Sequence, residues 1–198
     1  MEQMTAYLLL GSAYLLGSIS SAIIVCRLAK LPDPRTLGSG NPGATNVLRY
    51  GGKKLAGLTL FGDVLKGILP VIIARLLNMP DWVLAGCGLL AFTGHLYPIF
   101  FNLKGGKGVA TGFGALLALS WMVALSMLAI WLMMAKLFRY SSLSALTATL
   151  SAPVLITFIE PKSSYIIVSS VIALAIFWRH RSNIKKLLSG QEDKIGEK

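Results

Sequence analysis

Residues 38–49 read GSGNPGATNVLR, a polar segment between long apolar runs. Its glycines let successive backbone N–H groups turn toward one point, which is how a loop forms a concave site for an anion. Arg49 adds a planar guanidinium that suits phosphate or carboxylate. The segment therefore predicts half of a phosphate site, and a long turn without a ligand is the alternative interpretation of this segment alone. The further candidate groups in it are Ser39, Gly40, Asn41, Thr45 and Asn46.

A second glycine-rich segment, residues 104–108, reads KGGKG. Its glycines again free the backbone to approach a ligand, and its two lysines supply positive charge. By itself it could be only a basic loop between apolar runs. Two such loops on one side of a membrane favour a shared phosphate site. The candidate residues of this loop are Lys104, Gly105, Gly106, Lys107 and Gly108.

The composition indicates a membrane protein. Of 198 residues, 55% are hydrophobic and only 14% are charged, whereas about 25% are charged in ordinary soluble domains. The net charge of +11 comes from residues in short loops between apolar runs, which is typical of cytoplasmic loops and argues against a nucleic-acid partner. Cys26 and Cys87 lie in apolar segments without the spacing of metal ligands, so we expect neither a disulfide framework nor a metal site.

The first apolar run, residues 4–26, orients the chain. It is preceded by Glu2 and followed by Arg27 and Lys30, the reverse of the charge pattern of a signal peptide. The positive-inside rule then places the N-terminus outside and residues 38–49 in the cytoplasm.

Two further spans are predicted at residues 55–77 and 82–101. The first carries Asp63 and Lys66 on one helical face. Because ionisable groups are costly inside a bilayer, they should face the bundle, either as a structural ion pair or as part of a site. In the next span we expect His95 to form a hydrogen bond between helices.

The rest of the chain contains two longer apolar runs. Residues 108–135 are too many for one span and few for two. Basic residues flank both ends, which places both ends in the cytoplasm, so the chain must cross the membrane and return. This predicts two short spans meeting near Ser120 and Trp121. The same reasoning divides residues 143–178 near 160–163. The chain is therefore predicted to be all-α, an integral membrane bundle of seven transmembrane helices with a cytoplasmic C-terminus. Residues 1–188 would form one transmembrane domain with cytoplasmic active-site loops, and residues 189–198 a polar, disordered cytoplasmic tail.

In this topology the polar clusters gather on the inner leaflet. Ser142 follows a basic turn, and His180 and Asn183 follow the last span, so these residues should converge with the two glycine-rich loops on one interfacial site. Such a site would hold an anionic head group while an apolar tail lies among the helices. The role of His180 stays open between catalysis and a hydrogen bond to a neighbouring helix.

Three stretches of the chain resemble the cytoplasmic motifs of a known family, the PlsY family of bacterial acyl-phosphate:glycerol-3-phosphate acyltransferases. They read GSGNPGATN, GHLYPIFFNLKGGKGVATGFG and RHRSNI. The resemblance implies transfer of an acyl group from acyl phosphate to the 1-hydroxyl of sn-glycerol 3-phosphate, giving lysophosphatidic acid and phosphate, the first step of membrane phospholipid synthesis. It implies no cofactor or metal, a multi-pass protein of the bacterial inner membrane with its active site facing the cytoplasm, and as partners membrane lipid and the enzyme that forms acyl phosphate.

The chemistry of an acyl phosphate suggests roles for some of these residues. Lys104 and Arg49 would neutralise the departing phosphate, and the base would be either His180 or, as we expect, the phosphate of the substrate itself. The expected substrate-binding residues are Gly40, Asn41, Thr45, Asn46, Gly105, Gly106, Lys107 and Gly108. The expected catalytic residues are Ser39, Arg49, Lys104, Ser142, His180 and Asn183.

Two other classes of protein stay open on the residues alone. An anion transporter would need polar residues near the bilayer midplane, where the sequence offers only Asp63 and Lys66. A scaffold subunit of a larger complex would need neither glycine-rich loop.

Overall fold

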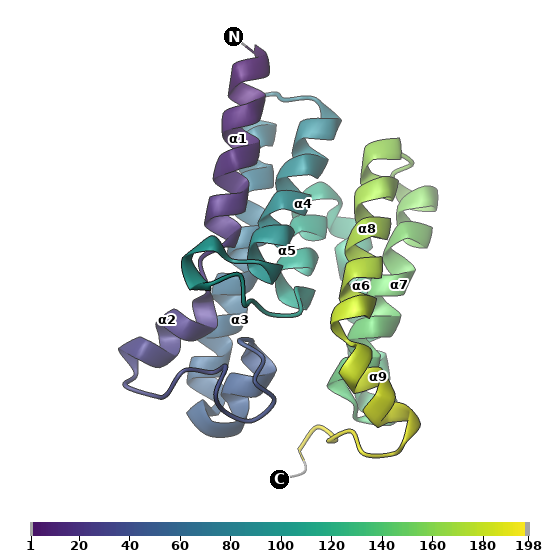
Figure 1. The fold of residues 1–198 in the computed structure, drawn as a ribbon. Helices are drawn as coiled ribbons and strands as arrows, with labels where there is room; N and C mark the ends of the chain where they lie inside the picture. Colours follow the sequence, from purple (N-terminus) through teal and green to yellow (C-terminus); the bar gives the residue numbers. More distant parts are fainter. Residues whose placement is uncertain (1, 197–198) are drawn as a thin grey trace. The chain divides into compact units, whose positions relative to one another are not determined.

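A computed structural model describes residues 2–196, which are helical or irregular and include no strand. The chain divides into two compact units, one ending at Leu119 and one beginning at Ser120. The helices of the first unit are α1 (Glu2–Gly17), α2 (Ser21–Leu28), α3 (Ala44–Leu76), α4 (Asp81–Leu96), the short 3₁₀ helix η1 (Ile99–Phe101) and α5 (Val109–Leu119) (Figure 1). Those of the second are α6 (Trp121–Phe138), α7 (Ser141–Ile159), α8 (Ser163–Arg179) and α9 (Arg181–Leu188).

Several helices are long and apolar enough to cross a membrane. By length and composition, α3, α4 with η1, α6 and α7 each qualify. The pairs α1 with α2 and α8 with α9 qualify if each is one bent span, with bends of 44° and 60°. Helix α5 has 11 residues and is about 16 Å long at 1.5 Å per residue, roughly half of a hydrocarbon core. The count of seven spans therefore stays a prediction.

The helix breaks predicted in the two longer apolar runs are confirmed. Helix α5 ends at Leu119 and α6 begins at Trp121, with Ser120 between them in an extended conformation. Helix α7 ends at Ile159 and α8 begins at Ser163.

The structure refines two of the predicted segments. The first apolar run, predicted as one span, is bent, because α1 ends at Gly17 and α2 begins at Ser21 at an angle of 44°. Residues 38–49 are not all loop, because α3 begins at Ala44 and its first turns carry the later part of this segment. At Gly52 the backbone has a φ of 78°, a conformation that glycine adopts readily, and this kink separates residues 44–51 from the span that follows.

Glycines allow close helix crossings in the first unit. Gly17 and Gly94 lie where α1 crosses α4, and Gly67 and Gly114 lie where α3 crosses α5. A Cβ added to Gly67 would lie 2.9 Å from the backbone nitrogen of Ala115, closer than real Cβ atoms approach. The helix backbones therefore touch at these crossings, as in other membrane helix pairs built on small residues.

In the second unit, α7 packs against both α6 and α8, around side chains such as Tyr165, Ile156 and Ile172 that are fully buried. The described part of the C-terminal segment also contacts this unit. Ile195 N donates to Arg139 O at 2.6 Å, and Arg139 Nη2 donates to Ile195 O at 3.2 Å. The turn after α6 therefore offers the described part of this segment two hydrogen bonds.

Candidate active site

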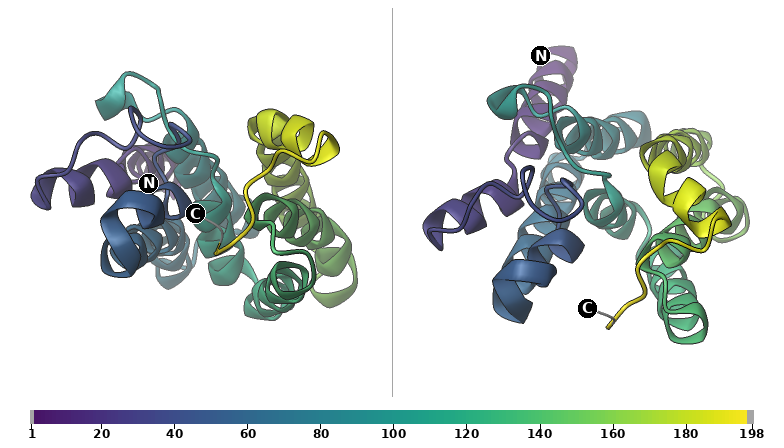
Figure 2. Two further views of the ribbon diagram at one scale, coloured as in Figure 1. Left: turned by 90° about the horizontal axis from the view of Figure 1, so that it is seen from below. Right: turned by 60° about the horizontal axis from the view of Figure 1, so that its bottom comes forward.

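The first unit brings two loops together: residues 29–43 between α2 and α3, and residues 97–108 between α4 and α5. Both views in Figure 2 show them side by side near the start of α3. They contain residues 38–43 of the first glycine-rich segment and all of the second, which the sequence suggested as halves of one phosphate site.

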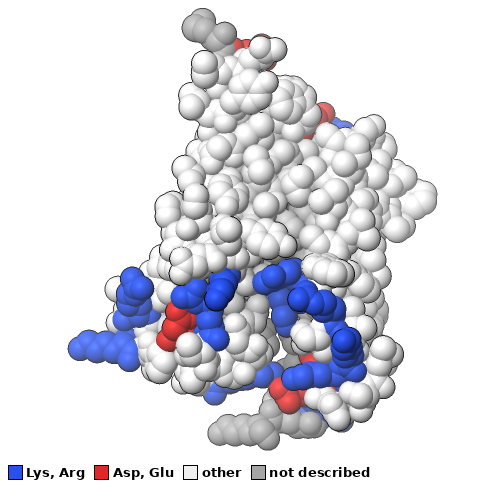
Figure 3. All heavy atoms as spheres, in the orientation of Figure 1, with Lys and Arg blue, Asp and Glu red and all other residues white. Residues whose placement is uncertain are grey.

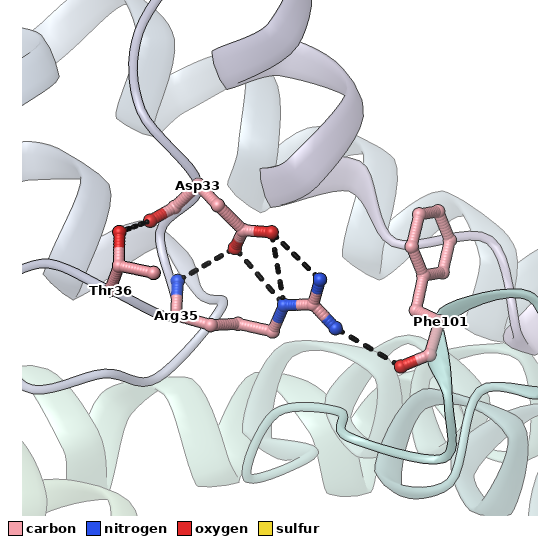
Figure 4. Close-up of polar contacts among 4 residues, drawn as sticks. All are labelled: Asp33, Arg35, Thr36 and Phe101. Carbon is pink, nitrogen blue, oxygen red and sulfur yellow. Dashed lines mark hydrogen bonds and ion pairs between the residues drawn. The ribbon is translucent and has the colours of Figure 1, made fainter.

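Arg35 joins these loops (Figure 4). Its Nε and Nη2 donate to the Asp33 carboxylate at 2.7 to 3.1 Å, and its Nη1 donates to the Phe101 carbonyl at 3.0 Å. Hydrogen bonds from the guanidinium hold the pKa of Asp33 below its ordinary value of 3.8, so the carboxylate stays charged. Thr36 Oγ1 donates to Asp33 O at 2.8 Å. The first loop is therefore folded around Asp33 and anchored to the second by one side chain.

Asn46 organises the first loop from inside. It is 2% exposed. Its Nδ2 donates to Pro34 O at 2.8 Å and to Leu37 O at 3.0 Å, and its Oδ1 accepts from Ser39 N at 2.9 Å. The sequence suggested Asn46 as a substrate-binding donor. In the structure its amide hydrogens bind loop carbonyls, so Asn46 shapes the loop that carries Ser39, and its contact with substrate stays a prediction.

The second loop lies against the last turn of α4. Gly106 N donates to His95 O, and Gly105 N donates to Leu96 O, both at 3.2 Å. A Cβ on Gly106 would overlap His95 Nε2 and would lie 3.2 Å from Pro42 O. Gly106 therefore sits between the His95 ring and the first loop, and no larger residue fits there without a shift.

The predicted residues of these loops divide into an accessible and a buried group. Figure 3 shows Lys and Arg of the first unit near the end away from its N-terminus, the end that carries both loops. An anion approaching this end would meet positive charge and polar donors. Asn41 and Lys107 are half-buried, and Gly106 and Gly108 are buried. The exposed residues are Ser39, Gly40, Thr45, Arg49 and Lys104.

In the second unit, two predicted residues share one acceptor. Ser142 Oγ, on the first turn of α7, donates to Glu192 Oε1 at 2.6 Å, and Asn183 Nδ2, on α9, donates to the same oxygen at 2.7 Å. Glu192 was missed at the level of sequence because it lies in the segment predicted to be disordered. No spacing or motif in the sequence indicated it.

His180 lies at the junction of α8 and α9 and is 4% exposed. Its Nδ1 lies 2.8 Å from Ile176 O. Because a carbonyl oxygen only accepts, Nδ1 carries a proton, and in the neutral ring the lone pair is on Nε2.

The buried ionisable pair predicted in α3 is present. Lys66 Nζ lies 2.9 Å from Asp63 Oδ1, and His95 Nδ1 lies 3.6 Å from the same oxygen. Within residues 2–196 there is no cluster of three or more His, Cys, Asp or Glu side chains that could hold a metal ion.

A family model described as "Glycerol-3-phosphate acyltransferase" matches residues 7–190. The chain belongs to this family. Glycerol-3-phosphate acyltransferases of Thioalkalivibrio sulfidiphilus (strain HL-EbGR7) and Neisseria meningitidis serogroup C (strain 053442) are 53% identical over 192 residues and 54% identical over 188 residues. These alignments cover 96% and 93% of this chain, and 94% of each relative.

Solved structures agree with the family assignment. The chain is similar to the crystal structure of PlsY (YgiH), described as an integral membrane glycerol 3-phosphate acyltransferase in its glycerol 3-phosphate form, with 44% identity, a TM-score of 0.93 and coverage of 97% of this chain and 96% of that one. The lysophosphatidic acid form of PlsY gives 42% identity, a TM-score of 0.91 and the same coverage. The resemblance inferred from the three motifs is confirmed. This member of the glycerol-3-phosphate acyltransferase family is an enzyme, an acyltransferase, and a multi-pass membrane protein.

Proposed function

We propose that this enzyme transfers an acyl group from acyl phosphate to the 1-hydroxyl of sn-glycerol 3-phosphate, releasing lysophosphatidic acid and phosphate. The observation that carries the proposal is the pair of loops in the first unit, fastened through Arg35 and Gly106 with Ser39, Arg49 and Lys104 exposed. Both substrates carry phosphate, and these residues offer the donors and charges that phosphate binds. The similarity to PlsY in its glycerol 3-phosphate and lysophosphatidic acid forms supports this acceptor and this product.

For this reaction the protein must position the two substrates and stabilise the negative charge on the leaving phosphate. Acyl phosphate is a mixed anhydride and is already activated. The hydroxyl oxygen attacks the acyl carbon, the bond from that carbon to the phosphate oxygen breaks, and phosphate leaves with the electron pair. Lys104 and Arg49 stabilise the charge that develops on phosphate, and the glycine-rich loop around Gly106 binds the phosphate of glycerol 3-phosphate.

The proton of the attacking hydroxyl passes to the phosphate of glycerol 3-phosphate. A phosphate monoester has a second pKa near about 6, so at neutral pH it is basic enough to accept this proton. His180 is the alternative base, because the contact of Nδ1 with Ile176 O leaves the lone pair on Nε2. Under the proposal His180→Gln lowers kcat less than about tenfold. A loss in the range of about 10²–10⁴, typical of removing a general base, would assign the step to His180.

The donor and the reaction are tested together with purified protein in detergent. Long-chain acyl phosphate with glycerol 3-phosphate should give lysophosphatidic acid and one phosphate per acyl transfer. The same acyl chain on coenzyme A should give no product. Product from the thioester alone, or no product from acyl phosphate, would refute the proposed donor.

We also propose seven spans, counting α5 as a short one, in the bacterial inner membrane with the N-terminus outside and the glycine-rich loops in the cytoplasm. The proposal rests on the positions of basic residues along the sequence. Single cysteines introduced in a cysteine-free background report the topology. A membrane-impermeant thiol reagent applied to intact cells should label position 162 and leave positions 51 and 189 unlabelled until the cells are opened. Labelling of position 51 in intact cells would reverse the orientation.

A further inference from the structure

The first unit contains a buried chain of charged and polar groups between α3, α4 and the break after α1. Asp63 and Lys66 are 3% and 5% exposed at the side chain, and their charged atoms lie 2.9 Å apart. Lys66 Nζ also donates to Ile19 O at 2.7 Å, a carbonyl in the break between α1 and α2. His95 is the third member, with Nδ1 3.6 Å from Asp63 Oδ1.

A buried ion pair is a poor device for stability alone. Desolvation of two charges can exceed their attraction, and apolar residues of similar volume often stabilise a fold better. In a membrane helix, ionisable side chains are costly and usually serve a site. The Asp63–Lys66 pair is complete on α3 by itself, because its members are three residues apart. The pair does not need His95 as a partner, so the position of His95 beside it requires another explanation.

His95 faces the pair on one side and the glycine-rich loop on the other. Its Nδ1 points to Asp63, while its Nε2 lies directly beneath Gly106, where a Cβ would overlap it. Its carbonyl accepts the N–H of Gly106 at 3.2 Å. On the other side of Gly106, Pro42 O lies 3.2 Å from the position of that Cβ. A change in the tilt of the ring would move Gly106 toward or away from the first loop.

We propose that Asp63 and His95 are positioning residues for the glycerol phosphate site. Asp63 orients the imidazole, Lys66 holds the Asp63 carboxylate in place, and the ring sets the position of Gly106 relative to Pro42. The loop backbone then meets the phosphate at the right distance. The inference rests on the proposed function, since it names what holds that site in shape.

The test removes the network without leaving a lone buried charge. The double variant Asp63→Asn/Lys66→Met is neutral and close in volume to the native pair, so it should fold, with a thermal midpoint no lower than that of Asp63→Asn alone. We expect it to raise KM for glycerol 3-phosphate about tenfold or more and to change kcat less than threefold. A pair that is only structural predicts recovery of both stability and KM in the double variant. A KM within twofold of the native enzyme would overturn the proposal.

A mutant cycle that combines Asp63→Asn/Lys66→Met with Gly106→Ala shows whether the network changes KM through the glycine-rich loop. If the network acts on Gly106, the combined triple variant should raise KM hardly more than the larger of the two separate changes, because residues in contact are not additive. Multiplication of the two effects would place the action of the network elsewhere and overturn the proposal.

Calorimetry with inorganic phosphate supplies a readout that does not require turnover. The native protein should bind phosphate more tightly than the double variant, by about the same factor as the change in KM. Equal affinities would overturn the positioning role. Absence of acyl transfer in the native protein would instead refute the proposed function, while the difference in phosphate affinity would still report on the network.

Discussion

Replacing Gly106 with alanine should weaken binding of glycerol 3-phosphate while leaving the acyl-transfer step nearly unchanged. The added methyl would lie 2.9 Å from His95 Cε1 and 3.2 Å from Pro42 O, and it would overlap His95 Nε2. Ordinary carbon contacts begin near 3.5 Å, so the loop must move by about 0.5–1 Å. A shift of this size can break a backbone hydrogen bond to the charged phosphate, which costs about 1.5–3 kcal/mol. We therefore expect KM to rise about 10- to 100-fold, or about 1.4–2.7 kcal/mol of binding free energy.

The assay measures initial rates with saturating acyl phosphate and varied glycerol 3-phosphate in neutral detergent. KM should rise with kcat within about threefold, the pattern of lost uniform binding. Gly57→Ala is the matched control, because an added Cβ there meets nothing within 4 Å, and it should behave as the native enzyme. An unchanged KM in Gly106→Ala, or an equal change in Gly57→Ala, would remove this loop from the substrate site.

Four further substitutions test charged residues. Arg49→Lys should lose most activity although the charge is kept, because a lysine cannot replace the planar guanidinium. Lys104→Ala should lower kcat/KM by about 10²–10³, as for a lost oxyanion donor. Near-native turnover of both variants across a salt series would mean that these residues only anchor the loops to lipid. Glu192→Ala should lower the thermal midpoint more than Glu192→Gln, because only alanine removes the oxygen that accepts from two side-chain donors; equal shifts would contradict this. Asp33→Asn should destabilise the protein at pH 7. Because the pKa of Asp33 is lowered from 3.8 by its guanidinium partner, its stabilisation is complete above that value and is lost as the pH falls through the lower folded pKa; a thermal-midpoint difference between the native protein and Asp33→Asn that does not shrink as the pH falls below 3.8 would refute the assignment.

The helix breaks differ in how far sequence could predict them. The breaks at Ser120 and after Ile159 follow from charge and length, because basic residues flank each long run and a single helix would be too long. The break after Gly17 has no such signal. Serines 18 and 20 are tolerated in membrane helices, and Ser18 Oγ donates to Tyr14 O at 2.9 Å, a contact made as readily inside a helix.

The site shows a similar division. Glycine-rich composition was enough to single out two loops, and the structure places them side by side; their binding of phosphate stays a prediction. The contact that joins the two loops was not predictable. Arg35 donates to the backbone carbonyl of Phe101, and because every residue has such a carbonyl, the sequence does not show which one Arg35 will contact. Asn46 was predicted to bind substrate because a side-chain amide can donate either to a ligand or to the backbone of its own loop. Only the fold shows that its hydrogens donate to loop carbonyls. Glu192 was missed because a polar tail gives no sign of where it will bind.

The glycine crossings of the first unit bear on how this protein meets membranes of different thickness. Where Gly17 and Gly94 bring α1 and α4 into backbone contact, the two helices cannot slide past each other or change their crossing without a clash. A single helix can adapt to hydrophobic mismatch by tilting, but here α1 and α4 can tilt only together. The lipid, being softer, would have to stretch or thin around the pair. In vesicles of graded acyl-chain length, the cost of mismatch should therefore fall on the bilayer, while the geometry between these helices stays constant.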